Sequence, residues 1–407
     1  MTAVARVSRQ AALAWIGVAL AAQGCATVPR GRAVPAELQS GANVIGFPGG
    51  IRYFPRDAGH VADFEQDYLD SLARERASLH LDNSARLPPA AYLAISGGGD
   101  NGAFGAGFLN GWTKTSTRPT FKLVTGVSTG ALIAPFAFLG PAYDETLKSL
   151  YTGVSLHDIA EKRSLLSVLY GDAMADTTPL RNLVKKYLTQ EVVDAVAAEH
   201  EKGRILLVAT TNLDVRRPVI WNITEIAATR AAGRLELIQE ILVASSAIPG
   251  TFPPVMIDVE AEGQKYQEMH VDGGTAAQVF VYPAAIQLAA LAERERVLYV
   301  IRNARLDPEW AEVDRRTLPI ALRAITCLIQ NQGLGDLYRI FAITQRDKVD
   351  FNLVYIPRSF QVQHTADFDP HYMKALFDLA EQMAEGGRAW EKHPPVLVSG
   401  VDQARRR

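Results

Sequence analysis

Two glycine-flanked turns, each placed between an apolar stretch and a helix-like stretch, limit strongly what this chain can fold into. The turns read Ser96-Gly97-Gly98-Gly99-Asp100-Asn101-Gly102 and Gly126-Val127-Ser128-Thr129-Gly130. Apolar residues precede each turn at 90–95 and 121–124, and helix-like stretches follow at 103–112 and 131–139. Strand, tight turn and helix in this order build α/β folds, and the second turn has the G-x-S-x-G pattern of a nucleophile elbow.

Strand-like and helix-like stretches alternate along the rest of the chain. The pattern predicts strands at 92–96, 123–127, 205–211, 219–222, 268–271, 297–301 and 351–356. It predicts further helices at 63–81, 178–188, 236–245, 284–294 and 372–385. Because the strands at 92 and 205 are nearly continuous apolar runs, we expect both faces of the sheet to be covered. The predicted fold class is α/β, a three-layer α/β/α arrangement with a mostly parallel central sheet.

Length and charge restrict the class of protein further. With 407 residues, 48% of them hydrophobic, the chain can bury a large core in one or two domains. Its net charge is −2, and no basic stripe stands out that would indicate a nucleic-acid partner. We interpret Arg405-Arg406-Arg407 as a solvated tail. The predicted organisation is a signal peptide at 1–25, a tether and helical extension at 26–88, a catalytic core at 89–285 and a C-terminal α/β continuation at 286–407.

The N-terminus has the layout of an export signal. Arg6 and Arg9 precede the uncharged apolar run 11–22, which is short for a membrane span. Cys25 follows at the expected cleavage point and resembles the lipidated cysteine of bacterial lipoprotein signals. We therefore expect a cell-envelope protein, held at a membrane surface by a lipid on Cys25. The alternative is an ordinary cleaved signal in which Cys25 has no role. The second cysteine, Cys327, lies among apolar neighbours, which predicts a buried, inert thiol.

The two turns suggest complementary chemical roles. The elbow exposes the Ser128 hydroxyl, and the backbone N–H of Thr129 follows it at the start of a helix. The amides of Gly97, Gly98 and Gly99 form an oxyanion hole in this interpretation. A dinucleotide site is disfavoured because no Asp or Glu occurs between Asn101 and Tyr143, where the ribose would need one.

A base for the serine is predicted at the third glycine-marked strand end. Asp272 precedes Gly273 and Gly274 there, and we expect apolar surroundings that raise its pKa. A triad remains open at this point, with His270, His364 or His371 as the histidine. The cysteines and histidines show no metal-ligand spacing, so neither a metal nor another cofactor is expected.

Taken together, these three motifs resemble the signatures of the patatin-like phospholipase family. The stretches Ala209–Asp214 and Ala244–Pro254 add to the likeness, which covers roughly 90–285. The resemblance implies a patatin-like fold and a lipid acyl hydrolase with a Ser128–Asp272 dyad. It also implies Gly97-Gly98-Gly99 as the oxyanion hole, with further motif glycines at Gly102, Gly126, Gly130, Gly273 and Gly274. The family usually has Arg or Lys where Asn101 stands.

The resemblance leaves the acceptor and the substrate open. We expect a phospholipid or another acyl ester as substrate, with water as the acceptor. An acyltransferase on the same site and a non-catalytic envelope lipoprotein are the alternatives. We expect aromatic residues of the first two helices to belong mainly to helix–sheet packing rather than to an acyl channel: Phe104, Phe108, Trp112, Phe136 and Phe138. The region after residue 305 is a candidate cap over the site.

Overall fold

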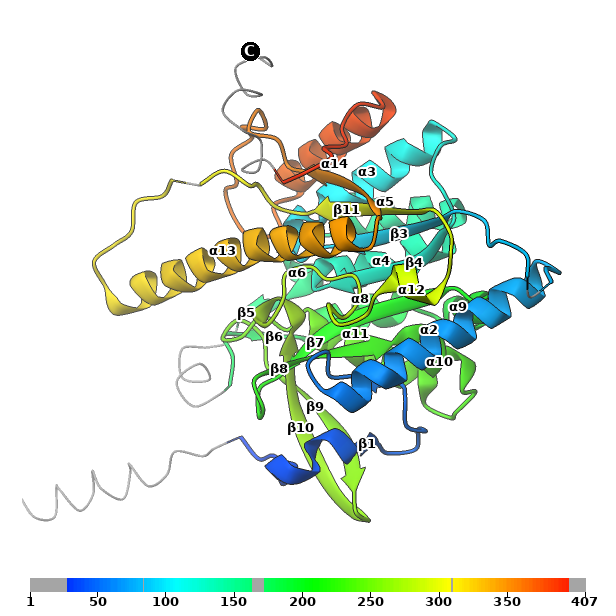
Figure 1. Cartoon of the computed structure of the whole chain (residues 1–407). Coiled ribbons are helices and arrows are strands. Elements are labelled where there is room, and N and C mark those ends of the chain that lie inside the picture. The colour runs from blue at the N-terminus through cyan, green and yellow to red at the C-terminus, as the bar shows by residue number, and fades with distance from the viewer. Residues whose placement is uncertain (1–27, 83, 163–171, 309, 395–407) are drawn as a thin grey trace, which may run out of the picture.

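The computed structural model describes residues 28–82, 84–162, 172–308 and 310–394 (Figure 1). Five parallel strands form the centre of its main sheet, in the order β12–β11–β3–β4–β7. Their bounds are Asp350–Tyr355, Arg296–Arg302, Ala90–Ile95, Phe121–Val127 and Ile205–Asn212. Every residue of β4 and β7 is buried, as expected for strands that are covered on both faces.

Antiparallel strands extend the sheet beyond β7. The carboxyl end of β7 pairs with β10 (Gln264–Asp272), which forms a hairpin with β9 (Val255–Ala261). β7 also pairs with β8 (Arg217–Asn222). The two-residue strands β1 (Asn43–Val44) and β2 (Arg52–Tyr53) pair with β9 and β8, and β5 (Glu161–Lys162) and β6 (Ala175–Asp176) form a separate pair. This extension brings β10 antiparallel to the parallel block, with its last residue beside the carboxyl end of β7.

Helices cover both faces of the sheet. The larger core includes side chains of α3 (Gly102–Lys114), α4 (Thr129–Leu139), α11 (Arg234–Ser245) and α14 (Pro370–Glu385). The same side carries α5 (Asp144–Thr152), α8 (Thr178–Tyr187), α9 (Gln190–Glu201) and α10 (Ile223–Ala228). On the opposite face, α2 (Ala58–Ser78) and α13 (Thr317–Arg346) contribute to the second core (Figure 1). Short helices α6 (Leu156–Ile159) and α12 (Leu288–Leu291) complete the described set. The predicted three-layer α/β fold with its mostly parallel central sheet is confirmed.

Most predicted elements are present, with one clear error. All seven predicted strands occur, although most are longer than expected. The helix predicted at 284–294 is wrong, because only Leu288–Leu291 is helical there. The Arg296 guanidinium donates to the carbonyl oxygens of Leu288 and Ala292, at 2.8 and 2.6 Å. These carbonyls are therefore bound by a side chain rather than by the N–H groups of a continuing helix.

The described part of the predicted tether is packed against the sheet, so that prediction is wrong for residues 28–57. Arg30 pairs with Asp214 at 2.7 Å, and the buried Arg52 pairs with Glu268 at 2.5 Å. Val34 is also buried. The partners lie about 200 positions away in the sequence, and strands of two residues show no detectable periodicity. The predicted signal peptide, Cys25 and Arg405–Arg407 lie outside the described residues.

The prediction of a buried Cys327 is also wrong, since its side chain is exposed. Figure 1 shows that the first part of α13 extends beyond the edge of the sheet, whereas its second part lies over it. Accordingly, Ile325 and Leu328 are exposed, and Leu337 and Ile340 are buried. The apolar neighbours of Cys327 therefore do not form a core.

Candidate active site

The turn after β4 has the strained geometry of an elbow. Ser128 adopts φ 55°, a conformation that is rare for residues other than glycine. A Cβ atom at Gly126 would stand 2.4 Å from the Gly130 carbonyl oxygen, and one at Gly130 would stand 2.3 Å from the Ile95 carbonyl oxygen. Only glycine therefore fits at either position without a shift of the backbone. The turn presents the serine hydroxyl at the carboxyl edge of the sheet.

Asp272 lies directly against this hydroxyl. The last residue of β10 is paired with Thr210 of β7, next to the position where Ala209 pairs with Val127. Ser128 Oγ donates a hydrogen bond of 2.6 Å to Asp272 Oδ2, and the Gly274 N–H donates one of 2.7 Å to Oδ1. Burial raises the pKa of Asp272 to about 7, although both hydrogen bonds favour the carboxylate. The structure thus joins a serine and a carboxylate that titrates near neutral pH.

The glycine loop after β3 lies beside the same pair, but its three amides are not equivalent. The Gly97 N–H donates to the Gln278 carbonyl oxygen at 3.1 Å, so it is not free to bind an oxyanion as predicted. Among the described residues, none accepts a hydrogen bond from the amides of Gly98 or Gly99, which line the pocket with Ser128. Thr129 is not among the described lining residues, and its hydroxyl shares a 2.6 Å hydrogen bond with the Tyr151 hydroxyl.

The remaining predicted motif glycines leave no room for a side chain: Gly273 faces a backbone carbonyl, and Gly102 and Gly274 face side chains. A Cβ atom would approach a neighbouring atom to 2.1 Å at Gly102, 2.3 Å at Gly273 and 2.5 Å at Gly274. At Gly98 it would lie 2.1 Å from the Asn303 carbonyl oxygen. A side chain at any of these positions would therefore require its neighbours to shift.

Three residues that fix this geometry were missed as site residues by sequence reasoning. Ser245 Oγ accepts a 2.9 Å hydrogen bond from the Ser128 N–H and donates to the Ala209 carbonyl oxygen at 2.7 Å. Asn303 Nδ2 donates to the Ser96 carbonyl oxygen, and its Oδ1 accepts from the Gly105 N–H. The Gln278 carbonyl oxygen accepts a hydrogen bond from the Gly97 N–H. Ser245 lies in the stretch Ala244–Pro254 that carried part of the resemblance; Asn303 and Gln278 stand in no recognised motif.

The three histidines considered for a triad have other surroundings. His270 is fully buried, with Nδ1 2.8 Å from Thr210 Oγ1 and Nε2 3.0 Å from Glu268 Oε2. His364 Nε2 lies 2.6 Å from Asp100 Oδ2, and His371 is exposed near the start of α14. No histidine is among the described residues that line the pocket around Ser128.

That pocket has a volume of about 310 Å³. Its polar lining includes Asn101, whose Oδ1 accepts a 2.7 Å hydrogen bond from the Tyr372 hydroxyl. Apolar side chains also line it: Ile248, Pro249, Ala304 and Ile329. Thr326, Ile329 and Gln330 of α13 form one wall. The predicted cap region therefore reaches the site through this helix.

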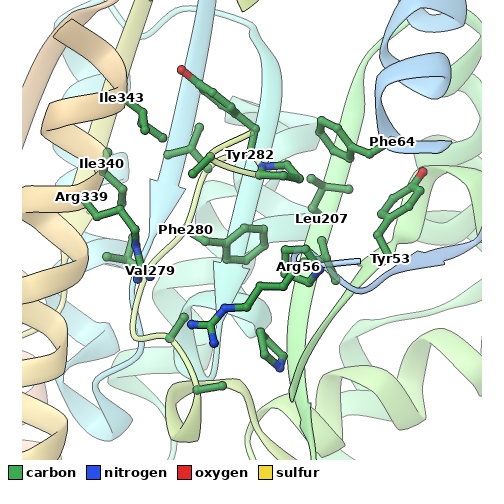
Figure 2. Close-up of a pocket in the computed structure, with 18 residues that line it drawn as sticks. Tyr53, Arg56, Phe64, Leu207, Val279, Phe280, Tyr282, Arg339, Ile340 and Ile343 are labelled. Atoms are coloured by element: carbon green, nitrogen blue, oxygen red, sulfur yellow. The ribbon is translucent and has the colours of Figure 1, made fainter. Parts of the chain in front are cut away.

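A second, apolar pocket of about 150 Å³ lies behind the segment that follows Asp272. Figure 2 shows Ile340 and Ile343 of α13 on one side of it and Phe64 of α2 on the other. Ala276, Ala277 and Val279 line this pocket, whereas Thr275 and Gln278 line the first one. The segment 275–279 thus separates the two pockets.

The aromatic residues considered for an acyl channel belong to the core, as expected. All five are at most 5% exposed and lie in the larger core: Phe104, Phe108, Trp112, Phe136 and Phe138. None of them lines the pocket around Ser128. In the described part of the chain, no group of three His, Cys, Asp or Glu side chains is placed to hold a metal ion. No described helix is both long and apolar enough to cross a bilayer.

Residues 93–285 match the sequence model of the patatin family, described as patatin-like phospholipase. The match spans all three glycine-marked turns and both members of the Ser128–Asp272 pair. The chain carries a patatin-like phospholipase domain.

Solved structures similar to this chain are remote from it in sequence. VipD from Legionella pneumophila is 11% identical, with a TM-score of 0.35 over 74% of this chain and 67% of that one. The type III effector protein ExoU is 14% identical, with a TM-score of 0.32 over 74% and 53%. Human GIVD cytosolic phospholipase A2 is 10% identical, with a TM-score of 0.30 over 73% and 54%. The chain thus spans between half and two thirds of these structures, and no curated protein matches its sequence.

Proposed function

We propose that this chain hydrolyses carboxylic esters of lipids with Ser128 as nucleophile and Asp272 as its base. The observation that supports this most directly is the 2.6 Å hydrogen bond from Ser128 Oγ to Asp272 Oδ2, inside a pocket lined by the amides of Gly98 and Gly99. A hydroxyl is a weak nucleophile unless a positioned base removes its proton. The carboxylate here has that position.

In the proposed reaction, Asp272 accepts the Ser128 proton as Oγ attacks the ester carbonyl carbon. A tetrahedral oxyanion forms, and its collapse breaks the carbon–oxygen bond of the ester. The leaving alcohol takes the proton from Asp272. Water then attacks the acyl-serine, giving its proton to Asp272, and the fatty acid leaves as the proton returns to Ser128. A base with a pKa near 7 suits both proton transfers at neutral pH.

The oxyanion site in this proposal uses the Gly98 and Gly99 amides, with the Thr129 amide as a third candidate. Gly97 is left out because its N–H is bound to Gln278. Amides that need not reorganise during the reaction stabilise developing negative charge strongly in a pocket that excludes water. The strained φ of Ser128 is held by the Ser245 hydroxyl, which binds the Ser128 N–H.

The dyad is preferred to a triad because each histidine has another partner or surrounding. A serine-hydrolase phosphonate probe tests the nucleophile: we expect labelling of the wild type and none of Ser128→Ala. Hydrolysis by His270→Ala, His364→Ala and His371→Ala tests the triad. A loss as complete as that of Ser128→Ala in the His364 or His371 variant would overturn the dyad. For the buried His270, thermal unfolding must accompany the assay, since its removal disturbs Thr210 and Glu268.

Two alternatives concern the same pocket. An acyltransferase would pass the acyl group from Ser128 to an alcohol rather than to water, so products formed with an added alcohol acceptor separate the two. A non-catalytic envelope lipoprotein would not be labelled by the probe in either the wild type or Ser128→Ala. Export, lipidation of Cys25 and attachment to an envelope membrane remain part of the proposal. Palmitate labelling of wild type and Cys25→Ala in the producing cells tests the lipid anchor.

A further inference from the structure

A buried arginine lines the pocket of the Ser128–Asp272 pair. Arg302 is the last residue of β11, and β11 lies directly beside β3, which leads into the glycine loop. Its side chain lines the same pocket as Ser128, Asp272 and Gly98, although the residue is only 3% exposed. A positive charge therefore lies at the wall of the site, away from bulk water.

This guanidinium lacks the carboxylate partner that two other buried arginines, Arg52 and Arg294, have. Arg52 pairs with Glu268, and Arg294 makes two 2.8 Å hydrogen bonds to the Glu75 carboxylate. In contrast, Arg302 Nη1 makes one long 3.5 Å contact with the neutral Gln278 Oε1, and its Nε has no hydrogen-bond partner among the described residues. No described carboxylate lies within 4.0 Å of it. A buried charge that forms no close ion pair is costly, and an anion bound in the pocket would supply one.

The described residues around Arg302 do not neutralise its charge by a close ion pair. Asp336 is near enough to influence Arg302, but its oxygens bind the Gln278 N–H and the Arg339 guanidinium. Gly333 of α13 faces the guanidinium, since a Cβ atom there would stand 2.3 Å from Arg302 Nη2. Burial lowers the pKa of Arg302 to about 10, opposed by the charge of Asp336. The side chain is therefore still a cation at neutral pH.

We infer that Arg302 binds the phosphate group of a glycerophospholipid whose ester lies at Ser128. A guanidinium matches phosphate oxygens with parallel N–H donors, which makes arginine suited to this group. In a glycerophospholipid, the phosphate and the scissile esters are attached to the same three-carbon glycerol, and Arg302 and Ser128 line one pocket of about 310 Å³. Asn101 also lines the pocket, but it is neutral and bound to Tyr372. This inference rests on the proposed hydrolase function and assigns the residue that selects a phosphate-bearing substrate.

The test compares two substrates that differ only in the phosphate-bearing head group. Phosphatidylcholine and diacylglycerol with the same acyl chains are presented in uncharged detergent micelles to the wild type, Arg302→Gln and Arg302→Lys. We expect Arg302→Gln to lower kcat/KM for phosphatidylcholine by about tenfold to a hundredfold, mainly through KM, the size of one hydrogen-bonded contact to a charged group. Hydrolysis of diacylglycerol should change less than about twofold. Arg302→Lys should recover part of the loss, and the exposed Arg358→Gln is the matched control.

An equal loss on both substrates would overturn the inference, because it would assign Arg302 to packing or to the chemical step. If the wild type hydrolyses neither substrate, the proposed function fails instead.

Binding of a short-chain ether analogue of phosphatidylcholine then still tests the phosphate site, with the dialkylglycerol as control. Binding of the ether analogue should be weaker in Arg302→Gln, whereas binding of the dialkylglycerol should not change. Inorganic phosphate separates a headgroup site from a free-phosphate site: full displacement of the ether analogue near 1 mM, without acyl-chain dependence, would refute the lipid assignment. If Arg302→Gln does not fold, the same competition in the wild type decides the question.

Discussion

Because Asp272 is buried, we expect the substitution Asp272→Asn to remove activity and to increase the stability of the fold. Burial raises the pKa of Asp272 in the folded protein from its ordinary 3.8 to about 7. Between these two values the folded chain keeps a proton that the unfolded chain has lost. The free energy of unfolding therefore falls as the pH rises through this window, and the contribution is constant again above about pH 8.

The magnitude follows from the difference in pKa. At 1.36 kcal/mol per pKa unit, a rise from 3.8 to about 7 corresponds to about 4 kcal/mol. Asp272→Asn removes the titration and can keep both hydrogen bonds. Its Oδ1 accepts from the Gly274 N–H, and its amide donates to Ser128 Oγ, which needs only to rotate its own proton. We therefore expect the variant to be about as stable as the wild type at pH 4 and up to about 4 kcal/mol more stable at pH 8.

Urea unfolding of both proteins at a series of pH values between 4 and 8.5 measures this difference, because titrations common to both chains cancel. The exposed Asp82→Asn serves as the control for loss of one surface carboxylate. The reasoning would be refuted by a stability difference that stays constant with pH or decreases as the pH rises. An active Asp272→Asn variant would refute the assignment of the base, whatever its stability.

Three further predictions concern the same region. Because only the carboxylate form of Asp272 accepts a proton, kcat/KM for a neutral ester should rise about tenfold per pH unit below pH 7 and level off above it, as measured by a pH–rate profile. Ser245→Ala leaves the Ser128 N–H without its acceptor, so kcat should fall about tenfold while Ser245→Thr retains more activity; unchanged kinetics in Ser245→Ala would contradict this role. Burial alone would raise the pKa of Glu268, but Arg52 and His270 lower it to about 2. Arg52→Met leaves this buried carboxylate without its ion pair, so it should destabilise the fold by about 3–5 kcal/mol in urea unfolding. The folded fraction of this variant should still be labelled by the phosphonate probe.

The tertiary arrangement explains why the site depends on the whole chain. Ser128, Asp272 and the glycine loop come from β4, β10 and β3, and Asn303 at the end of β11 fastens the glycine loop from outside the matched segment 93–285. β11 and β12 belong to the same sheet as β3, so the stretch predicted as a C-terminal continuation completes the fold that carries the site. A fragment that ends at residue 285 would lose the edge on which the glycine loop rests.

The sequence by itself determined the features that local chemistry encodes. Strands that are buried on both faces appear in the sequence as apolar runs, which indicate the α/β class. Glycines mark tight turns that other residues cannot adopt, and these turns identify Ser128, Asp272 and Gly98. The alternation of Val255, Ile257 and Val259 in β9 is also present in the sequence, although it is not among the predicted strands.

Only the tertiary structure decided which of these groups are free to act. The Gly97 amide is bound to Gln278, Cys327 lies on the exposed part of α13, and Arg302 has no carboxylate partner in the described part of the chain. Each of these facts depends on a neighbour far away in the sequence. A pattern of residue types records which groups a chain has, whereas the partner of each group, and hence its pKa and its availability, is set by how distant segments pack.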